Sequence, residues 1–245
     1  MSGAGKRQDP PLDMSCPPGD APITVPAARC VIFDFDGTLA PNLDLPDMRR
    51  QVIALTREHE VPEPVYADRY IVEIIDAASD WLSAQRPEAA RDYHARAHRL
   101  ITEFELAAAR RTLPFAEIPD ALAALRAADV GLGVVTRNCA AAVRAVFADI
   151  DRYCTAVLAR DDVAYLKPDP RHVQLALDRL QCAAPDSIMV GDGQLDMHVG
   201  RALGMFCVGV LTGSSDAERL HAAGADLVLP RAADLTPLIL AGAGR

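Results

Sequence analysis

After Pro114 the chain alternates short apolar runs with segments of helical spacing, and this alternation constrains the fold more than any other feature. A run of four apolar residues at 30–33 precedes it and ends at charged residues, as buried central strands do. Strands that alternate with helices form a parallel sheet covered by helices on both faces. The sequence therefore predicts a doubly wound α/β fold. The expected strands are 30–33, 131–135, 155–158, 187–190, 206–210 and 226–229, and the expected helices are 120–128, 140–148, 171–180 and 195–203.

The segment 44–113 shows no convincing strand and consists of Ala-, Arg-, Glu- and Leu-rich stretches interrupted by prolines. Its last stretch has an apolar face at helical spacing, formed by Tyr93, Ala97, Leu100, Ile101, Phe104 and Ala108. A chain of 245 residues can hold an α/β core and an inserted subdomain. We expect a core of residues 29–43 and 114–245 with a small helical insertion at 44–113. Residues 1–28, rich in Pro and Gly, are expected to form a disordered tail.

Charge and composition exclude several classes of protein. The formal net charge of -9 argues against nucleic acid as the main partner, which needs a basic surface. No run approaches the ~20 apolar residues that span a bilayer, and no apolar leader follows Lys6 and Arg7. Six scattered cysteines without a CxxC pair indicate reduced thiols. We expect a cytoplasmic monomer or homodimer with no membrane partner.

Polar residues follow three of the expected strands. Asp34 and Asp36 follow the first and Thr136 the second, while Asp192 and Asp196 follow a later one. In parallel sheets, ligands bind beyond the carboxyl ends of the strands. With Lys167 in the loop 167–170, these residues supply the groups that phosphoryl transfer requires.

The residue types suggest a role for each side chain. A phosphate ester is anionic, and Mg²⁺ with its preference for hard oxygen ligands can bridge it to carboxylates, of which Asp34 and Asp192 are the leading candidates. Once the metal and Lys167 have screened the charge, Asp34 can attack phosphorus. Asp36 can protonate the leaving alcohol and later deprotonate water. The hydroxyl of Thr136 and the amides of the next two residues, Arg137 and Asn138, can bind phosphate.

These segments resemble the haloacid dehalogenase superfamily of hydrolases, particularly its phosphoglycolate-phosphatase-like branch. The four motifs of that superfamily occur in order as 34–39 (DFDGTL), 134–138 (VVTRN), 167–170 (KPDP) and 190–196 (VGDGQLD), and the resemblance covers nearly everything after Ala28. It implies a Mg²⁺-dependent phosphatase that forms an aspartyl-phosphate intermediate on a small phosphomonoester such as phosphoglycolate or a sugar phosphate. It also implies a helical cap at 44–113.

The resemblance assigns roles to the same residues. It implies that Asp34 is nucleophile and metal ligand, and that Asp36 is the acid/base and offers its backbone carbonyl to the metal. Asp192 is implied as a metal ligand, supported by Asp196, while Thr136 and Lys167 bind phosphate. The dehalogenases themselves lack the second Asp of the first motif, so Asp36 favours phosphate chemistry. Gly193 stands where relatives often have a small hydroxyl residue, and this departure is not expected to remove activity.

Other interpretations of these residues are less well supported or remain open. A calcium loop is disfavoured because Leu39 and Leu45 occupy the positions of its Gly and Glu. His94 and His98 stand one helical turn apart, but without a clear third ligand they are expected to be solvated or packed against the cap. Tyr66, Arg69, Arg91 and His94 are possible substrate contacts. A phosphomutase with the same aspartyl-phosphate chemistry, and a catalytically idle binding module, remain as rival functions.

Overall fold

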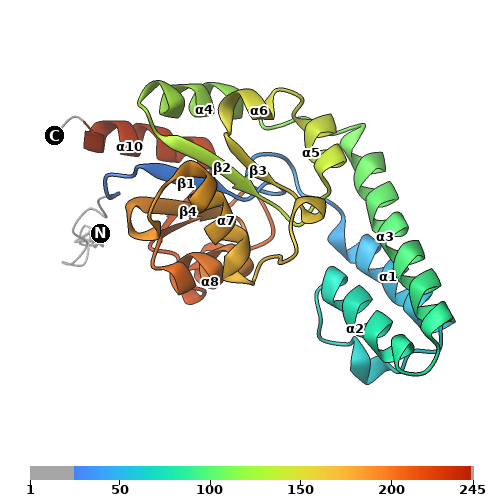
Figure 1. Ribbon diagram of the computed structural model, residues 1–245. Helices are drawn as coiled ribbons and strands as arrows, with labels where there is room; N and C mark the ends of the chain where they lie inside the picture. Colours follow the sequence, from blue (N-terminus) through green and yellow to red (C-terminus); the bar gives the residue numbers. More distant parts are fainter. Residues whose placement is uncertain (1–24, 244–245) are drawn as a thin grey trace, which may run out of the picture.

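The computed structural model describes residues 25–243 and contains a six-stranded sheet whose strand pairs are all parallel (Figure 1). The strand order is β3-β2-β1-β4-β5-β6, so the first strand lies in the middle. This confirms the predicted doubly wound α/β fold. The strands are β1 (Cys30–Phe33), β2 (Gly131–Val135), β3 (Ala156–Leu158), β4 (Ser187–Gly191), β5 (Phe206–Val210) and β6 (Leu227–Leu229).

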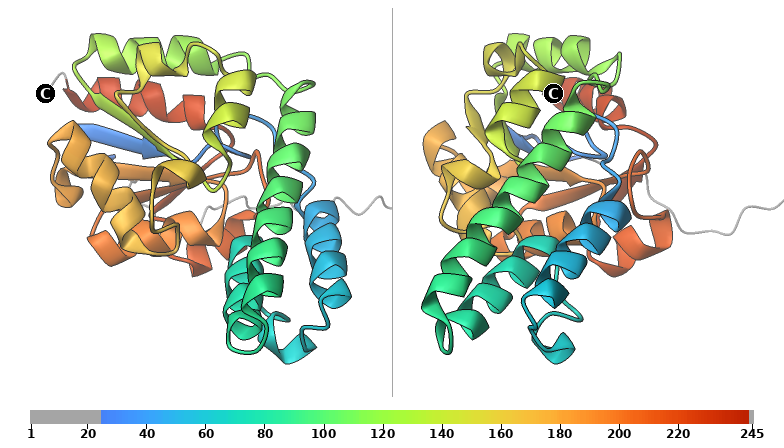
Figure 2. Two further views of the ribbon diagram at one scale, coloured as in Figure 1. Left: turned by 45° about the vertical axis from the view of Figure 1, so that its right-hand side comes forward. Right: turned by 90° about the vertical axis from the view of Figure 1, so that its right-hand side faces the viewer.

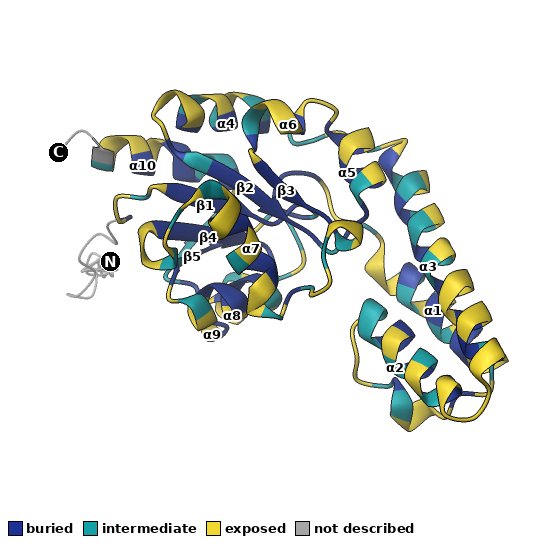
Figure 3. Cartoon of the chain, viewed as in Figure 1, coloured by how far each residue is buried: buried dark blue, intermediate teal, exposed yellow. Residues whose placement is uncertain are grey.

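Helices cover both faces of the sheet because side chains of each strand point alternately to the two sides. Val31 and Phe33 of β1 belong to one apolar cluster and Ile32 to the other. The first cluster includes residues of α4 (Ile118–Ala127), α5 (Ala140–Val146), α6 (Ile150–Tyr153) and α10 (Leu235–Ala243), and the second includes residues of α7 (Pro170–Leu180), α8 (Gln194–Leu203) and α9 (Ala217–Ala222). The strands are therefore buried, apart from the half-buried edge strand β6, while the helices expose their outer faces (Figure 3).

Three helices lie between β1 and α4, beside the sheet (Figure 2). They are α1 (Leu45–Glu58), α2 (Ile71–Ser83) and α3 (Pro87–Ala109), with a 3-10 turn at Glu63–Val65. Their facing stripes form a third apolar cluster, which contains the predicted face residues Tyr93, Ala97 and Ile101. Within residues 25–243, no helix combines the length and the apolar character needed to cross a bilayer.

Strand positions agree with the predictions to within one residue at each end. Apolar runs bounded by polar residues define buried strands sharply, whereas helix ends such as those of α4 differ by up to two residues. The predicted disordered tail lies mostly outside the described residues; of its last four residues, Val25 is buried in the first apolar cluster.

The cysteines differ from the prediction. Cys30, at the start of β1, and Cys182, just after α7, form a disulfide with a Cα–Cα distance of 6.4 Å, within the usual range. The prediction of reduced thiols is therefore wrong for this pair, because the fold brings together residues separated by 152 positions. Cys139, Cys154 and Cys207 are free and buried.

We expect Ile75→Ala to lower the free energy of unfolding by roughly 2 to 5 kcal/mol, because Ile75 is fully buried among α1, α2 and α3 and its truncation leaves a cavity. Urea denaturation measures the effect. Ser83→Ala, at the exposed end of the same helix, is the matched control. A loss below about 1 kcal/mol for Ile75→Ala would contradict the observed packing.

Candidate active site

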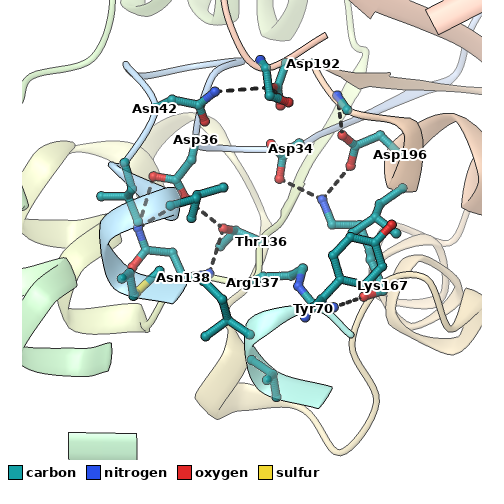
Figure 4. A pocket seen from close by; sticks show the side chains of 18 of the residues that line it. Asp34, Asp36, Asn42, Tyr70, Thr136, Arg137, Asn138, Lys167, Asp192 and Asp196 are labelled. Carbon is teal, nitrogen blue, oxygen red and sulfur yellow. Dashed lines mark hydrogen bonds and ion pairs between the residues drawn. The ribbon is translucent and has the colours of Figure 1, made fainter. Parts of the chain in front are cut away.

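The eight residues that the sequence assigned to catalysis, phosphate binding or the metal all line one cavity of about 780 Å³ at the carboxyl ends of the strands. Figure 4 shows their side chains converging from the ends of β1, β2 and β4, the loop before α7 and the first turn of α8. Parallel strands end at the same edge of the sheet, so residues far apart in sequence meet there. The eight residues are Asp34, Asp36, Thr136, Arg137, Asn138, Lys167, Asp192 and Asp196.

Lys167 lies between two carboxylates. Its Nζ donates to Asp34 Oδ1 at 2.7 Å and to Asp196 Oδ1 at 2.6 Å. The lysine side chain is only 2% exposed, so both contacts are shielded from bulk water. Burial favours the neutral amine, but Asp196 and Asp34 raise the pKa of Lys167 above its usual value. Lys167 therefore stays charged and fixes one oxygen of Asp34.

Asp34, Asp192 and Asp196 form a carboxylate cluster able to hold a divalent cation. One oxygen from each lies within 4.8 Å of the others, and all three residues are buried. With Lys167 the group carries a formal charge of two negative units, which one divalent cation would neutralise. Burial raises the pKa of Asp34 well above its usual value, and Asp196 and Asp192 add to this against the opposing effect of Lys167. Oxygen donors and surplus charge both fit a hard cation such as Mg²⁺.

Asp192 is held by partners that the sequence analysis missed. Its Oδ2 accepts hydrogen bonds from the Ser214 amide at 2.6 Å and hydroxyl at 2.8 Å, and from Asn42 Nδ2 at 3.3 Å. Gly213 has to be glycine, because a Cβ there would lie 2.0 Å from Asp192 Oδ2. Ser214 follows β5, so the rule of polar residues after strands could have found it.

Asp36 lies beside the other polar residues of the second motif. Asn138 Nδ2 contacts both of its carboxylate oxygens, at 3.1 and 3.2 Å, and the Thr136 hydroxyl approaches at 3.4 Å. Burial raises the pKa of Asp36 to about 7, with the Asn138 hydrogen bond opposing the shift. A carboxyl group with such a pKa can give and take a proton near neutrality. The backbone N–H of Asn138 donates to Thr136 Oγ1 at 3.0 Å. This hydrogen bond occupies the N–H that the sequence predicted to bind phosphate.

The Arg137 side chain turns towards α2 and is engaged there. It donates to both oxygens of Glu73, at 2.6 and 2.9 Å, and also to the backbone carbonyl of Lys167. Its guanidinium carbon lies 5.5 Å from the ring centre of Tyr70. Arg137 therefore connects the end of β2 to the helical segment.

A second ion pair joins the helical segment to the strand ends and was also missed. Arg160, after β3, pairs with Glu105 of α3 through both of its terminal nitrogens, and both side chains are buried. Glu105 also accepts from the amide of Cys139 at 3.2 Å. A sequence signal existed, since Glu105 stands four residues after Ile101 and so falls on the buried face of α3.

His172 positions the backbone of Lys167. Its Nδ1 accepts from the Lys167 amide at 3.3 Å, while Nε2 lies 3.2 Å from the Leu158 carbonyl, so the neutral Nε2–H form satisfies both contacts. Burial, together with the charge of Lys167, lowers the pKa of His172 to about 4.

The four predicted substrate contacts do not line the cavity; instead α2 contributes Tyr70, Ile71 and Val72 around its first turn. The carboxylate of Asp76 lies near His94 and His98, and one possible ligand atom of each residue lies within 4.8 Å of the other two. Asp76 is thus a candidate for the third ligand that the sequence did not reveal. His94 is exposed and His98 half-buried, in line with the expected solvated or packed state.

We expect Gly191→Ala to abolish the binding of a divalent cation to the carboxylate cluster, measured by calorimetry, because the added Cβ would lie 2.3 Å from the Asp196 side chain. The matched change Gly193→Ala places a Cβ 3.4 Å from Asp196 Oδ2, an ordinary contact, and should retain binding. Equal binding by both variants would contradict this geometry.

We expect acidification from about pH 6.5 to pH 4.5 to destabilise the protein partly through His172. The unfolded chain takes up a proton near the usual pKa of about 6.5, whereas the folded imidazole resists protonation until about pH 4. The contribution of neutral His172 to the free energy of unfolding is therefore present above pH 6.5. It decreases by on the order of 2 kcal/mol as the pH falls to 4.5. Chemical denaturation at both pH values should show a smaller loss for His172→Asn; identical losses would exclude this role.

Two known proteins that resemble this chain in sequence are hydrolases, in agreement with the residues of the cavity. The model of the haloacid dehalogenase-like hydrolase family matches residues 31–210. The chain is 29% identical over 219 residues to a phosphoglycolate phosphatase of Pectobacterium atrosepticum, covering 87% of this chain and 93% of that protein. It is 27% identical over 226 residues to the pyrophosphatase PpaX of Bacillus velezensis, covering 87% and 97%.

Solved structures share the fold. The β-phosphoglucomutase of Clostridium difficile superposes with a TM-score of 0.63 at 14% identity, covering 89% of this chain and 97% of that one. The family match spans most of the chain and includes the ends of β1, β2 and β4, from which the cavity residues project. The chain therefore belongs to the haloacid dehalogenase-like hydrolase family.

Proposed function

We propose that this hydrolase is a Mg²⁺-dependent phosphatase that cleaves a small phosphomonoester through an aspartyl-phosphate on Asp34. The contact of Lys167 Nζ with Asp34 Oδ1 at 2.7 Å, inside the carboxylate cluster, carries the proposal. It presents a fixed carboxylate beside a buried positive charge, the environment in which a carboxylate can approach an anionic phosphate.

The reaction has two balanced steps. In the first, an oxygen of Asp34 forms a bond to phosphorus while the bond from phosphorus to the ester oxygen breaks, and Asp36 gives its proton to the leaving alcohol. In the second, Asp36 takes a proton from water, the water oxygen bonds to phosphorus, and the bond to Asp34 breaks. Inorganic phosphate leaves and Asp36 is protonated again. The pKa of Asp36 near 7 suits both roles.

The remaining residues bind and orient the phosphate. Lys167 would offset its charge, and the Thr136 hydroxyl and the Arg137 amide, at the carboxyl end of β2, would donate hydrogen bonds to its oxygens. Asp34, the backbone carbonyl of Asp36 and Asp192 would hold the metal, with Asp196 in support. When bound, Mg²⁺ supplies positive charge next to the phosphate oxygens.

We further propose that residues 44–113 act as a cap over a core made of residues 29–43 and 114–245. The separate apolar cluster of α1, α2 and α3 supports this division. Closure of such a cap would exclude water from the aspartyl-phosphate until hydrolysis. A cytoplasmic location, a monomeric or homodimeric state and a phosphorylated metabolite as partner stay predictions.

The names of the relatives suggest substrates to test. Phosphoglycolate phosphatase and pyrophosphatase are the activities in the names of the two sequence relatives above. Phosphoglycolate and pyrophosphate are therefore the first candidates for this chain, beside the sugar phosphates predicted from the sequence.

We expect Asp34→Asn to reduce the release of phosphate from 4-nitrophenyl phosphate by at least about 10³-fold, because an amide cannot attack phosphorus.

Asp36→Asn should reduce the turnover of ethyl phosphate by roughly 10²-fold to 10⁴-fold. It should reduce the turnover of 4-nitrophenyl phosphate less, since nitrophenolate leaves without a proton. EDTA should stop the reaction and Mg²⁺ should restore it. Asp129→Asn, an exposed change outside the cavity, is the control.

The products separate the rival functions. Release of inorganic phosphate from a sugar phosphate indicates a hydrolase, whereas an isomeric sugar phosphate indicates a mutase with the same nucleophile. Wild-type protein that turns over none of these esters, with no further loss in Asp34→Asn, would identify an idle binding module.

A further inference from the structure

The cavity extends well beyond the phosphate-binding end. Its volume of about 780 Å³ falls within the range of sites that enclose drug-sized ligands, and a phosphate with a two-carbon leaving group would fill only part of it. The carboxylates and Lys167 occupy the floor, at the strand ends, while α1, α2 and α3 supply the opposite wall. The leaving group of a substrate would face that wall.

The opposite wall is mainly apolar. Leu45 and Tyr70 keep 41% and 50% of their surfaces exposed although both are large hydrophobic residues. Large apolar side chains left in water around a concave surface indicate a site for an apolar ligand group. This apolar wall is formed by Leu45, Met48, Tyr70, Ile71, Val72 and Ile101.

The arginines nearest to the floor are already paired with acids. Arg137 makes a two-pronged contact with Glu73, and Arg160 makes another with the buried Glu105. A carboxylate on a substrate could bind either guanidinium only by competing with these glutamates. Separating the buried pair is unfavourable, because it leaves Glu105 charged without a partner.

The other two arginines along the cavity are also engaged. Arg49 donates through both terminal nitrogens to the carbonyls of Arg69 and Ala67. Arg219 lies 3.7 Å from Asp216 at the exposed start of α9. Among the described residues that line the cavity, no arginine therefore offers a buried, unpaired positive charge to a second anionic group.

From the apolar wall and the paired arginines we infer that the site prefers phosphomonoesters whose leaving alcohol carries a sizeable apolar group, aromatic or branched alkyl, over those that carry a carboxylate. This rests on the proposed phosphatase function and narrows its candidate substrates away from phosphoglycolate. The phosphate would sit at Lys167 and the carboxylate cluster, and the apolar group would lie against Leu45, Tyr70 and Ile71.

Three esters with similar alkyl leaving groups test the preference: 2-phenylethyl phosphate, ethyl phosphate and phosphoglycolate, each with Mg²⁺ and with phosphate release measured as kcat/KM. We expect 2-phenylethyl phosphate to exceed ethyl phosphate by about tenfold or more, since the phenyl group gains apolar contacts. Phosphoglycolate should be the poorest of the three. A kcat/KM for phosphoglycolate equal to or above that for 2-phenylethyl phosphate overturns the inference.

Two exposed leucines provide a matched pair of variants. Leu45→Ser should reduce the ratio of kcat/KM for 2-phenylethyl phosphate to that for ethyl phosphate by severalfold. Leu113→Ser, at a residue 75% exposed and outside the cavity, should leave this ratio unchanged. Equal ratios in both variants would remove the apolar wall as the cause.

Glu73→Gln tests the paired arginines. It should raise kcat/KM for phosphoglycolate relative to 2-phenylethyl phosphate, because Arg137 is then free to bind a carboxylate. An unchanged ratio counts against this part of the inference.

The proposed function has its own readout. If none of the three esters releases phosphate, the phosphatase proposal fails too. Release that depends on Asp34 but favours phosphoglycolate overturns only the substrate preference.

Discussion

Three buried carboxylates meet one buried ammonium group where the strands end, and the surplus negative charge of that cluster organises the site around it. Lys167 contacts Asp34 and Asp196 but cannot balance Asp192 as well. In water an unbalanced carboxylate would cost little, but here burial raises the pKa of Asp34, and the neighbouring carboxylates add to that effect against the opposing charge of Lys167. The arrangement is suited to an added cation, and the hydrogen bonds of Ser214 and Asn42 hold Asp192 ready for it.

The same strand ends also carry the connections to the helical segment. Arg137 and Arg160 follow β2 and β3, and each reaches an acid on α2 or α3. The two pairs differ in their surroundings: Arg160 and Glu105 are buried, whereas Arg137 and Glu73 are partly exposed. Water screens the second pair more strongly, so it is the one more readily exchanged.

Much of this arrangement could be predicted from local patterns, because it depends on them. Apolar runs identified the strands, and parallel topology brings whatever follows those strands to one edge. Partners could not be predicted when they depend on the rotation and direction of a helix: the Glu105 contact to Arg160 spans 55 residues and the cysteine pair 152. For the same reason the sequence could not rank Tyr66, Arg69, Arg91 and His94 as possible substrate contacts. None of the four lines the cavity, where Tyr70 and the first residue of α2, Ile71, lie instead.

Because α3 is long, a small rotation of this helix about one end would displace its other end by a large distance. The helix has 23 residues, and its contact with the sheet domain lies near its carboxyl end, at Glu105. Pro87, at the other end, stands roughly 27 Å away along the helix axis. A pivot of only five degrees about Glu105 would carry the far turn through about 2 Å, enough to separate side chains that touch. Any sub-ångström adjustment beside the strand ends would therefore appear magnified severalfold at the amino-terminal end of α3, where a fluorescent label would record it.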